Sequence, residues 1–341
     1  MTVDFYDLSE DDQVDRLTTL AKKSLSEWGI KKADLWLLKY RENAVFGVRD
    51  IENNQKYVLR LHREGYHSDA ALLSELHWMA ALNNSGIETP PVIPTTDGRL
   101  FSHVGGEGVP TIRQCDLLGW IDGDPIGMIE KGNIVDEETT RRNYFNTGNM
   151  AARLHNQAQE WVAPEGFWRH SWDVNGLLGD EPLWGQFWKY KHLDIEQRNI
   201  ILQVRAKLQT DLTTFGKSID RYGLTHADFL PENLLINDGR LRIIDFDDCG
   251  YGWHMMDLAT ALFFLLGTPA FEPAFEGFIE GYRSVRDLPD EHLEMLPTFF
   301  IARGLVYLSW CHTRSETDTA KQLGPLIVDG IIEMARDYLN N

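Results

Sequence analysis

The segment from His226 to Asp247 restricts the possible folds of this chain more than any other feature of the sequence. It opens with the motif His226-Ala-Asp-Phe-Leu-Pro-Glu-Asn and closes with Ile-Ile-Asp-Phe-Asp247. Two apolar stretches, separated by the turn residues Asn-Asp-Gly-Arg, lie between these polar groups. We therefore expect a loop, a strand over 234–236, a tight turn, and a strand over 241–244 that ends at Asp245.

The polar residues of this segment match the needs of phosphoryl transfer. That reaction needs a carboxylate beside the acceptor hydroxyl and oxygen ligands that hold Mg²⁺ on the nucleotide phosphates. Asp228 can receive the proton of the hydroxyl group, and Asn233 can turn its amide oxygen towards a metal ion. Asp245 is the second expected metal ligand. A chance match to five specified positions is expected in about 1 chain in 10,000.

At these residues the chain resembles the superfamily of aminoglycoside phosphotransferases and choline kinases, which are small-molecule kinases with a protein-kinase-like fold. The resemblance runs over residues 35–265. Met150–His155 resembles the helix that precedes the catalytic loop, and Asp257 resembles the aspartate that opens the next helix and supports this loop. The resemblance implies that Asp228 and His226 are catalytic, and that ATP and Mg²⁺ are required.

The nucleotide-binding residues follow from the same resemblance. Leu118–Gly123 resembles the hinge whose backbone contacts adenine, which implicates Trp120 and Ile121. A Gly-x-Gly-x-x-Gly motif is absent, and the stretch 40–47 stands where a phosphate-covering loop belongs. There Asn43 and nearby backbone N–H groups can hold the phosphates, although a plain polar hairpin explains the stretch equally well.

A basic residue on the third strand grips the phosphates in the resembled fold, where it pairs with a glutamate on the following helix. The matching positions are Arg60 and Glu75. Arginine in place of the usual lysine keeps the charge but changes the geometry of its donors. The alternative is that Arg60 and Glu75 form an ordinary exposed pair.

Two departures from protein kinases favour a small-molecule acceptor. In His-Arg-Asp kinases the arginine of this motif binds the phosphorylated activation loop, and Ala227 stands at its position here. Asp257 follows Asp245 by only twelve positions, which leaves little room for a segment that docks a peptide. A bacterial Ser/Thr protein kinase of the stress-kinase type remains an alternative. A catalytically idle binding module is another, although the intact Asp228 and Asn233 argue against it.

The pattern of elements predicts an α+β fold of two lobes, with residues 1–121 as the nucleotide-binding lobe and 122–341 as the helical lobe. In the smaller lobe Ser9 opens a helix that runs to Trp28, and further elements follow. We expect strands over 33–39, 44–48, 57–62, 99–104 and 112–120, and a helix over 69–82. From Glu137 onwards the chain is predicted to be mostly helical, with four long helical stretches after Gly252.

Composition narrows the classes of partner and compartment. The 341 residues are 43% hydrophobic and carry a formal net charge of −19. This charge argues against nucleic acid as a partner, because proteins bind its phosphates through basic patches. The three scattered cysteines indicate reduced thiols, and the acidic start lacks the pattern of a signal peptide. No apolar stretch is long enough to span a bilayer. We therefore expect a cytoplasmic enzyme.

The acidic balance favours an acceptor that carries an amine, and homoserine-like, hydroxylysine-like, choline-like and aminoglycoside acceptors all fit. Asp247 or Asp248 can pair with an ammonium group, and Trp253 can contribute a cation–π contact. Arg169 can bind a carboxylate, although a surface role fits it as well. An unusual density of aromatic residues surrounds these positions, comprising Trp168, Trp172, Trp184, Trp188, Trp253 and His254. Most of them are expected in the core.

Overall fold

The computed structural model describes residues 5–41, 43–127, 136–315 and 317–340, which form parts of two compact units. The first unit comprises residues 1–123, 162–168 and 242–247, and the second comprises residues 124–161, 169–241 and 248–341. Asp245 and Asp247 therefore belong to the first unit, whereas Asp228 and Asn233 belong to the second.

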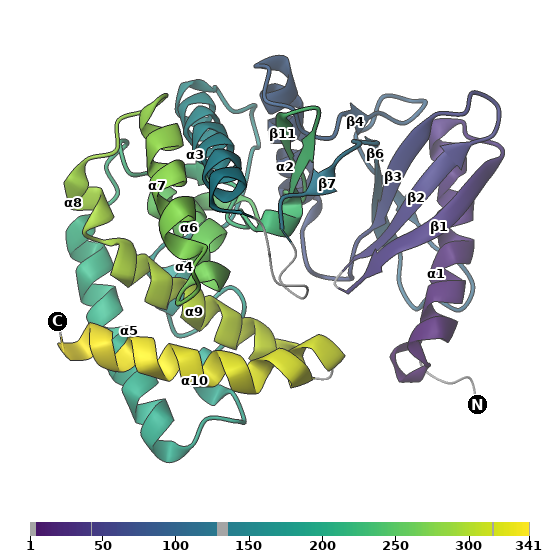
Figure 1. Ribbon diagram of the computed structural model, residues 1–341. Coiled ribbons are helices and arrows are strands. Elements are labelled where there is room, and N and C mark those ends of the chain that lie inside the picture. The colour runs from purple at the N-terminus through teal and green to yellow at the C-terminus, as the bar shows by residue number, and fades with distance from the viewer. Residues whose placement is uncertain (1–4, 42, 128–135, 316, 341) are drawn as a thin grey trace. The chain divides into compact units, whose positions relative to one another are not determined.

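A six-stranded antiparallel sheet forms the centre of the first unit (Figure 1). Its strands are β1 (Ala33–Tyr40), β2 (Ala44–Asp50), β3 (Lys56–Leu61), β4 (Val92–Ile93), β5 (Ser102–Val104) and β6 (Arg113–Gly119). The order is β1-β2-β3-β6-β4, and β5 also pairs with β6. The alternating and β-branched stretches thus form strands as predicted, with small shifts at their ends. The strand predicted to start at residue 99 begins only at Ser102.

One face of this sheet is covered by the helix that the N-terminal sequence predicts. Helix α1 (Glu10–Ser24) begins at Ser9, whose hydroxyl oxygen accepts a hydrogen bond from the backbone N–H of Asp12 at 3.2 Å. The last turn tightens into the 3₁₀ helix η2 (Leu25–Trp28), which ends at Gly29 with φ of +71°. The apolar face of α1 packs against alternate residues of β2, β3 and β6, which creates the core of this unit.

Helix α2 (Asp69–Asn84) connects the sheet to the segment that carries Asp245. It begins at Ser68, which caps the backbone N–H of Ala71. The Trp78 ring meets the Phe246 ring edge-on, with centroids 5.5 Å apart. The backbone N–H of Ile243 donates to the carbonyl oxygen of Glu88 at 3.2 Å. Segment 242–247 is therefore built into the first unit, although it lies far from β3 in the sequence.

The second unit is mostly helical, as predicted (Figure 1). Its longer helices are α3 (Glu137–Glu160), α5 (Ile195–Phe215), α6 (His254–Leu262), α7 (Phe271–Arg283), α9 (Leu296–Thr313) and α10 (Asp318–Asn340). Shorter pieces are β7 (Asp124–Pro125), β8 (Ser171–Trp172), α4 (Val174–Leu178), η3 (Phe187–Lys189), β9 (Tyr222–Thr225), η4 (Pro231–Asn233), β10 (Leu234–Asn237), β12 (Gly250–Trp253), η5 (Phe263–Leu265) and α8 (Asp290–Leu293). Strand β11 (Arg240–Ile243) begins in the second unit and ends in the first. The two strands predicted around the turn at 237–240 are confirmed as β10 and β11.

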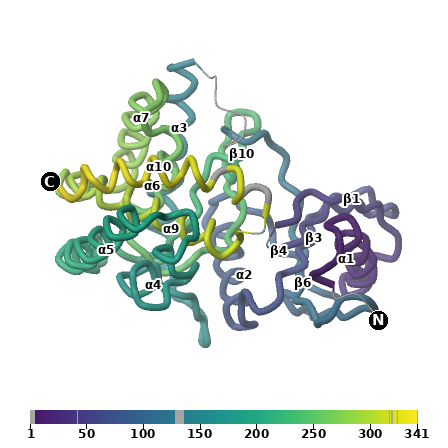
Figure 2. The backbone as a smooth tube through the Cα atoms, turned by 90° about the horizontal axis from the view of Figure 1, so that it is seen from below, coloured from purple at the N-terminus to yellow at the C-terminus, as the bar shows by residue number. Residues whose placement is uncertain are grey.

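Glycine allows α3 and α7 to lie against each other along much of their length. A Cβ atom on Gly148 would stand 2.0 Å from the carbonyl oxygen of Phe278, and one on Gly281 would stand 1.9 Å from that of Phe145. Any side chain at these positions would force the helices apart. Helix α10 lies against α5 and α9 on another side of the unit (Figure 2).

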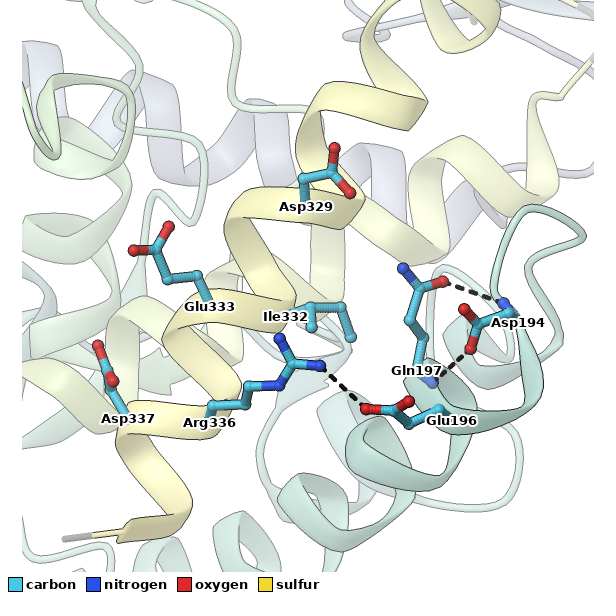
Figure 3. A pocket seen from close by; sticks show the side chains of 8 residues that line it. All are labelled: Asp194, Glu196, Gln197, Asp329, Ile332, Glu333, Arg336 and Asp337. Carbon is cyan, nitrogen blue, oxygen red and sulfur yellow. Dashed lines mark hydrogen bonds and ion pairs between the residues drawn. The ribbon is translucent and has the colours of Figure 1, made fainter.

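A groove of about 520 Å³ lies beside α5 and α10 and is lined mostly by carboxylates (Figure 3). Arg336 donates to Glu196 there at 3.0 Å. Within the described ranges, no helix combines the length and apolar character required to cross a lipid bilayer.

Candidate active site

The loop that follows β9 is held in a strained conformation from two sides. Ala227 has a φ of +64°, a left-handed value that is unfavourable for residues other than glycine. Asp257 on α6 accepts the backbone N–H groups of Ala227 at 2.8 Å and of His226 at 3.3 Å. Arg303 on α9 donates to the carbonyl oxygen of Ala227 at 3.1 Å. These contacts from two helices fix the peptide groups around Ala227, which directs the next residue, Asp228.

Both carboxylate oxygens of Asp228 are engaged. Arg303 donates through Nη2 to Oδ1 at 2.8 Å, and Asn233 donates through Nδ2 to Oδ2 at 2.9 Å. The same Asn233 nitrogen lies 3.0 Å from the backbone oxygen of Asp228. The Asp228 side chain is 17% exposed. Since the amide nitrogen of Asn233 is used in this way, its amide oxygen is the atom that it can offer to a cation.

His226 was predicted to be catalytic together with Asp228, but its ring is fully buried. Its Nδ1 accepts the backbone N–H of Asp228 at 3.2 Å, and its ring packs edge-on against Phe229. A ring without solvent-exposed surface cannot contact a substrate. His226 therefore stabilises the loop, and we leave it out of the catalytic group.

A buried chain of hydrogen bonds extends from Asp257 into the helical core. His155 lies 3.0 Å from Asp257 Oδ2 through Nε2, and 2.9 Å from the Tyr282 hydroxyl through Nδ1. Burial lowers the pKa of His155 well below its usual value, and the charge of Arg286 contributes in the same direction. The ring is therefore neutral. Its Nε2 donates a hydrogen bond to the Asp257 carboxylate, and its Nδ1 accepts one from the Tyr282 hydroxyl. Burial raises the pKa of Asp257 to about 6.

Arg303 was not predicted from the sequence, although it contacts the most important carboxylate. It is the one charged residue in the apolar run 296–311. A lone charge on an otherwise apolar helix requires a buried partner, and this signal points to a functional residue. The residue is 2% exposed, and its guanidinium carbon lies 4.5 Å from the ring centroid of Tyr307 and 5.9 Å from that of Trp184.

In the first unit, Arg60 and Glu75 form a buried pair, which excludes the alternative of an exposed surface pair. Arg60 Nη1 donates to Glu75 Oε1 at 2.7 Å. The same guanidinium makes a fork to Asp116, with Nε at 2.9 Å from Oδ1 and Nη2 at 3.0 Å from Oδ2. His62 contacts the same Asp116 carboxylate. Burial opposes the charged form of Asp116, but Arg60 and His62 outweigh it and lower its pKa.

Either Asp247 or Asp248 was predicted to pair with an ammonium group, and the surroundings of Asp247 argue against that role for it. Asp247 is only 8% exposed. Its Oδ2 accepts from Asn43 Nδ2 at 3.1 Å, and its backbone oxygen lies 2.8 Å from His67 Nε2. Burial raises the pKa of Asp247, but the hydrogen bond from His67 and the charges of His67, His62 and Arg60 lower it further than burial raises it. The carboxylate is thus committed within the first unit.

Asn43 is bound on both sides of its amide group. Its Nδ2 donates to Asp247, and its Oδ1 accepts the backbone N–H of Arg63 at 2.9 Å. The turn between β1 and β2 is thereby tied both to the end of β3 and to the segment that carries Asp245. A contact between the Asn43 side chain and a nucleotide phosphate remains a prediction, and the turn's backbone N–H groups are its other candidate donors.

Asp245 is exposed and has a φ of +68°, another left-handed residue that is not glycine. Such strain concentrates at functional positions. Among the residues that the structure describes, no cluster of three or more His, Cys, Asp or Glu side chains could hold a metal by itself. Asn233 belongs to the second unit and Asp245 to the first, and their joint role as metal ligands stays a prediction.

Trp120 of the predicted hinge packs against a tryptophan of the sheet. Trp120 lies 5.9 Å from Trp36 of β1 between ring centroids, and its Nε1 donates to Asp122 at 2.9 Å. The backbone N–H of Trp120 donates to the carbonyl oxygen of Lys56 at 3.3 Å, so this group is already used. A contact between the hinge backbone and adenine would therefore have to come from the carbonyl oxygen of Trp120 or from Ile121.

The remaining acceptor candidates have different environments. Trp253 is 1% exposed and its Nε1 donates to the carbonyl oxygen of Gly216 at 2.6 Å, so it is a core residue and we leave it out of the acceptor site. Arg169 is 4% exposed and donates to the carbonyl oxygen of Cys249 at 2.6 Å. The burial of Arg169 argues against the surface role. Its hydrogen bond to Cys249 fixes the backbone beside Asp248.

Asp248 is half-buried and lies at one end of an aromatic series in the second unit. Its carbonyl oxygen accepts from the Trp172 indole at 2.8 Å, and the Trp172 ring meets the Trp184 ring edge-on at 5.5 Å. Trp184 in turn lies under Arg303, which holds Asp228. Packed side chains thus connect Asp248 to Asp228.

This chain is similar to known phosphotransferases and small-molecule kinases. The model of a phosphotransferase enzyme family matches residues 41–293. The structure of a microcompartment-associated aminopropanol kinase is similar with a TM-score of 0.82 at 31% identity, covering 95% of this chain and 98% of that one. Amicoumacin kinase of Bacillus subtilis (strain 168) is 24% identical over 310 residues, covering 87% of this chain and 85% of its own length. An amicoumacin kinase in complex with AMP-PNP, Ca²⁺ and Ami shows the same fold, with a TM-score of 0.76 at 20% identity, covering 95% of this chain and 96% of that one.

Proposed function

Since this chain belongs to the phosphotransferase enzyme family and is a small-molecule kinase, we propose that it transfers the γ-phosphoryl group of ATP to the hydroxyl group of a small amino alcohol. The observation that carries the proposal is the fixed orientation of the Asp228 carboxylate. Its carboxylate is oriented by Arg303 and Asn233 and keeps 17% of the side chain exposed. A carboxylate held in this way can accept a proton from a hydroxyl group placed beside it.

In the proposed reaction, the acceptor oxygen attacks the γ-phosphorus and forms the new O–P bond. The bond between the γ-phosphorus and the bridging oxygen breaks, and ADP leaves with the bonding electrons. The hydroxyl proton passes to Asp228. Orientation of the hydroxyl is the main contribution of Asp228, because phosphoryl transfer depends chiefly on positioning and electrostatic stabilisation.

We propose Asn233 and Asp245 as the metal ligands and the Arg60 cluster as part of the nucleotide site. An amide oxygen and an exposed carboxylate are suitable ligands for Mg²⁺, which would neutralise charge on the phosphates. Arg60 uses three of its five N–H groups on Glu75 and Asp116, so its remaining N–H groups can donate to a phosphate oxygen.

The location proposed for the protein is the cytoplasm. Cys115, Cys249 and Cys311 are buried free thiols, which suits this location.

The amine of the acceptor is the finer part of the proposal. The Asp247 carboxylate accepts from Asn43 and lies 3.5 Å from His67 Nε2, which favours Asp248 as the carboxylate for an ammonium group. The aromatic series from Trp172 to Trp184 connects the backbone oxygen of Asp248 to Arg303. The similarity to an aminopropanol kinase at 31% identity supports an amino alcohol over a neutral sugar.

The experiment compares 1-amino-2-propanol with 2-butanol, its uncharged isostere, by ADP release at low and high salt. Homoserine, choline and an aminoglycoside are assayed in parallel. We expect a higher kcat/KM for the amino alcohol and a smaller advantage at high salt, since screening weakens the attraction of the ammonium group. Asp248→Asn should remove this advantage, whereas Asp238→Asn, at an exposed turn in the same unit, should retain it.

Equal kcat/KM for both compounds would contradict the amine but leave the kinase assignment intact. Phosphorylation of a peptide mixture without any phosphorylation of the small acceptors would favour a protein kinase. ATP turnover that Asp228→Asn does not change would contradict the role of Asp228.

A further inference from the structure

We propose that Arg303 of α9 is a positioning residue for phosphoryl transfer that acts through Asp228. The inference rests on the function proposed above for Asp228 and assigns a role to a residue outside the loop motif. Arg303 stands 75 positions after Asp228 in the chain, and their contact is 2.8 Å long. The aspartate is therefore oriented by a helix, in addition to the loop in which it lies.

The two partners of Asp228 divide the carboxylate between them. Arg303 holds Oδ1, and Asn233 holds Oδ2. Each carboxylate oxygen can accept more than one hydrogen bond, so an acceptor hydroxyl can still donate to it. With both oxygens held, the carboxylate plane has one preferred orientation. Loss of Arg303 would leave Oδ2 held by Asn233 and would allow Oδ1 to turn about that contact.

Arg303 uses its fork geometry, which lysine cannot reproduce. Nη2 donates to Asp228 Oδ1 while Nη1 donates to the carbonyl oxygen of Ala227 at 3.1 Å. The guanidinium thus holds both the carboxylate and the strained peptide group that precedes it. A lysine ammonium at this position carries the charge but lacks a rigid pair of donors.

The surroundings of Arg303 keep its side chain in place. It is 2% exposed and lies against the rings of Tyr307 and Trp184. Burial lowers the pKa of Arg303, but the neighbouring Tyr307 and Asp228 raise it above its usual value, so the residue stays charged. A buried, charged and sterically confined donor has little freedom to reorient, which suits a positioning role.

A double-mutant cycle tests the inference, with Arg303→Met and Asp228→Asn made separately and together. Single-turnover rates with excess enzyme, ATP and 1-amino-2-propanol keep the slow variants measurable. We expect Arg303→Met alone to lower the rate by roughly 10- to 100-fold with little change in the KM for ATP. In the Asp228→Asn background, the same change should lower the rate by less than about 2-fold, because residues that act as a unit are not additive.

Arg314→Met is the matched comparison, because Arg314 is also a buried arginine that packs against Trp184. Whatever effect it has should be the same with and without Asp228. If Arg303→Met produces the same fold loss in both backgrounds, Arg303 does not act through Asp228 and the inference is overturned. An Asp228→Asn enzyme with normal turnover would instead contradict the proposed function itself.

Arg303→Lys keeps the inference testable if the methionine variant does not fold. Lysine retains the charge and much of the apolar chain, so a folded protein with a near-normal Tm is expected. Its kcat should lie between those of Arg303→Met and the wild type, because one of the two donors is lost. A wild-type kcat in Arg303→Lys would show that the fork is not needed and would overturn the inference.

Discussion

Asn43 Nδ2 donates to Asp247 Oδ2 at 3.1 Å, a contact between residues 204 positions apart. It joins the turn between β1 and β2 to the segment that presents Asp245. His67 contacts the backbone oxygen of the same residue at 2.8 Å. If the turn covers the phosphates and Asp245 holds the metal, Asp247 keeps these two parts of the nucleotide site at a fixed separation within the first unit.

The first prediction concerns this connection. Asp247→Ala should raise the KM for ATP by roughly 10-fold or more, because a hydrogen-bonded charge in the interior contributes about 1.5–3 kcal/mol. The KM for the acceptor should change little. Initial-rate kinetics with each substrate varied in turn provide the measurement. Asp97→Ala, an exposed aspartate of the same unit, is the control. A raised KM for the amine acceptor alone would return Asp247 to the acceptor site.

The second prediction concerns Asp228. Asp228→Asn should lower kcat by roughly 100-fold or more, while the Kd for ATP measured by calorimetry remains close to the wild-type value. The amide preserves the shape but removes the proton-accepting charge. Asp238→Asn should have normal kinetics. Near-normal turnover in Asp228→Asn would mean that the proton goes elsewhere.

The third prediction concerns the stability of the Arg60 cluster. Arg60→Ala should destabilise the protein by about 3–5 kcal/mol, because it leaves the buried Glu75 and Asp116 without their cation. Arg49→Ala removes a comparable pair with Asp34 from the same sheet, but there both side chains are half exposed. That loss should stay below about 1 kcal/mol. Urea unfolding of both variants makes the comparison, and equal losses would contradict it.

Arg60 also yields a kinetic expectation, which is the fourth prediction. Arg60→Ala should raise the KM for ATP, and Arg60→Lys should reverse only part of this increase. Lysine cannot hold Asp116 with two parallel hydrogen bonds and donate to Glu75 simultaneously. Acceptor affinity should remain unchanged in both variants. Unaltered ATP kinetics in Arg60→Ala would limit Arg60 to a structural role.

The fifth prediction concerns pH and stability. Burial lowers the pKa of His155 and His254 well below their usual value, so the folded state binds fewer protons there than the unfolded chain. Their stabilising effect is present above pH 6.5 and is lost as the pH falls, by roughly 1 kcal/mol each between pH 7.5 and 5.5. Asp257, whose pKa is raised to about 6, acts in the opposite direction and offsets part of this loss.

Urea unfolding at the two pH values tests the balance. The free energy of unfolding should fall from pH 7.5 to 5.5, and His254→Asn should reduce the fall. His103→Asn, at an exposed histidine, should not change it. A wild-type protein whose stability rises over this interval would show that Asp257 outweighs both histidines.

The sequence by itself determined the features that depend on residues near each other in the chain. Ser9 and Gly29 bound the first helical segment because a cap satisfies the free N–H and C=O groups of the adjacent turn. Alternation predicted β1 to β3, and the turn at 237–240 predicted the hairpin of β10 and β11. The loop from His226 to Asn233 followed from the spacing of its polar residues, and the kinase-like fold followed from the resemblance of this motif to a known family.

Only the tertiary structure decided which polar groups are committed to one another. The sequence leaves open whether Asp247 or Asp248 is available to an ammonium group, whereas in the structure Asp247 accepts a hydrogen bond from Asn43. Likewise Arg303 holds Asp228, and Asp116 holds Arg60. The residues of each of these pairs are 56 to 204 positions apart. Local propensity carries no information about such contacts. They form because a charge buried by packing must find a partner, and the packing of distant helices and strands determines which partner is within reach.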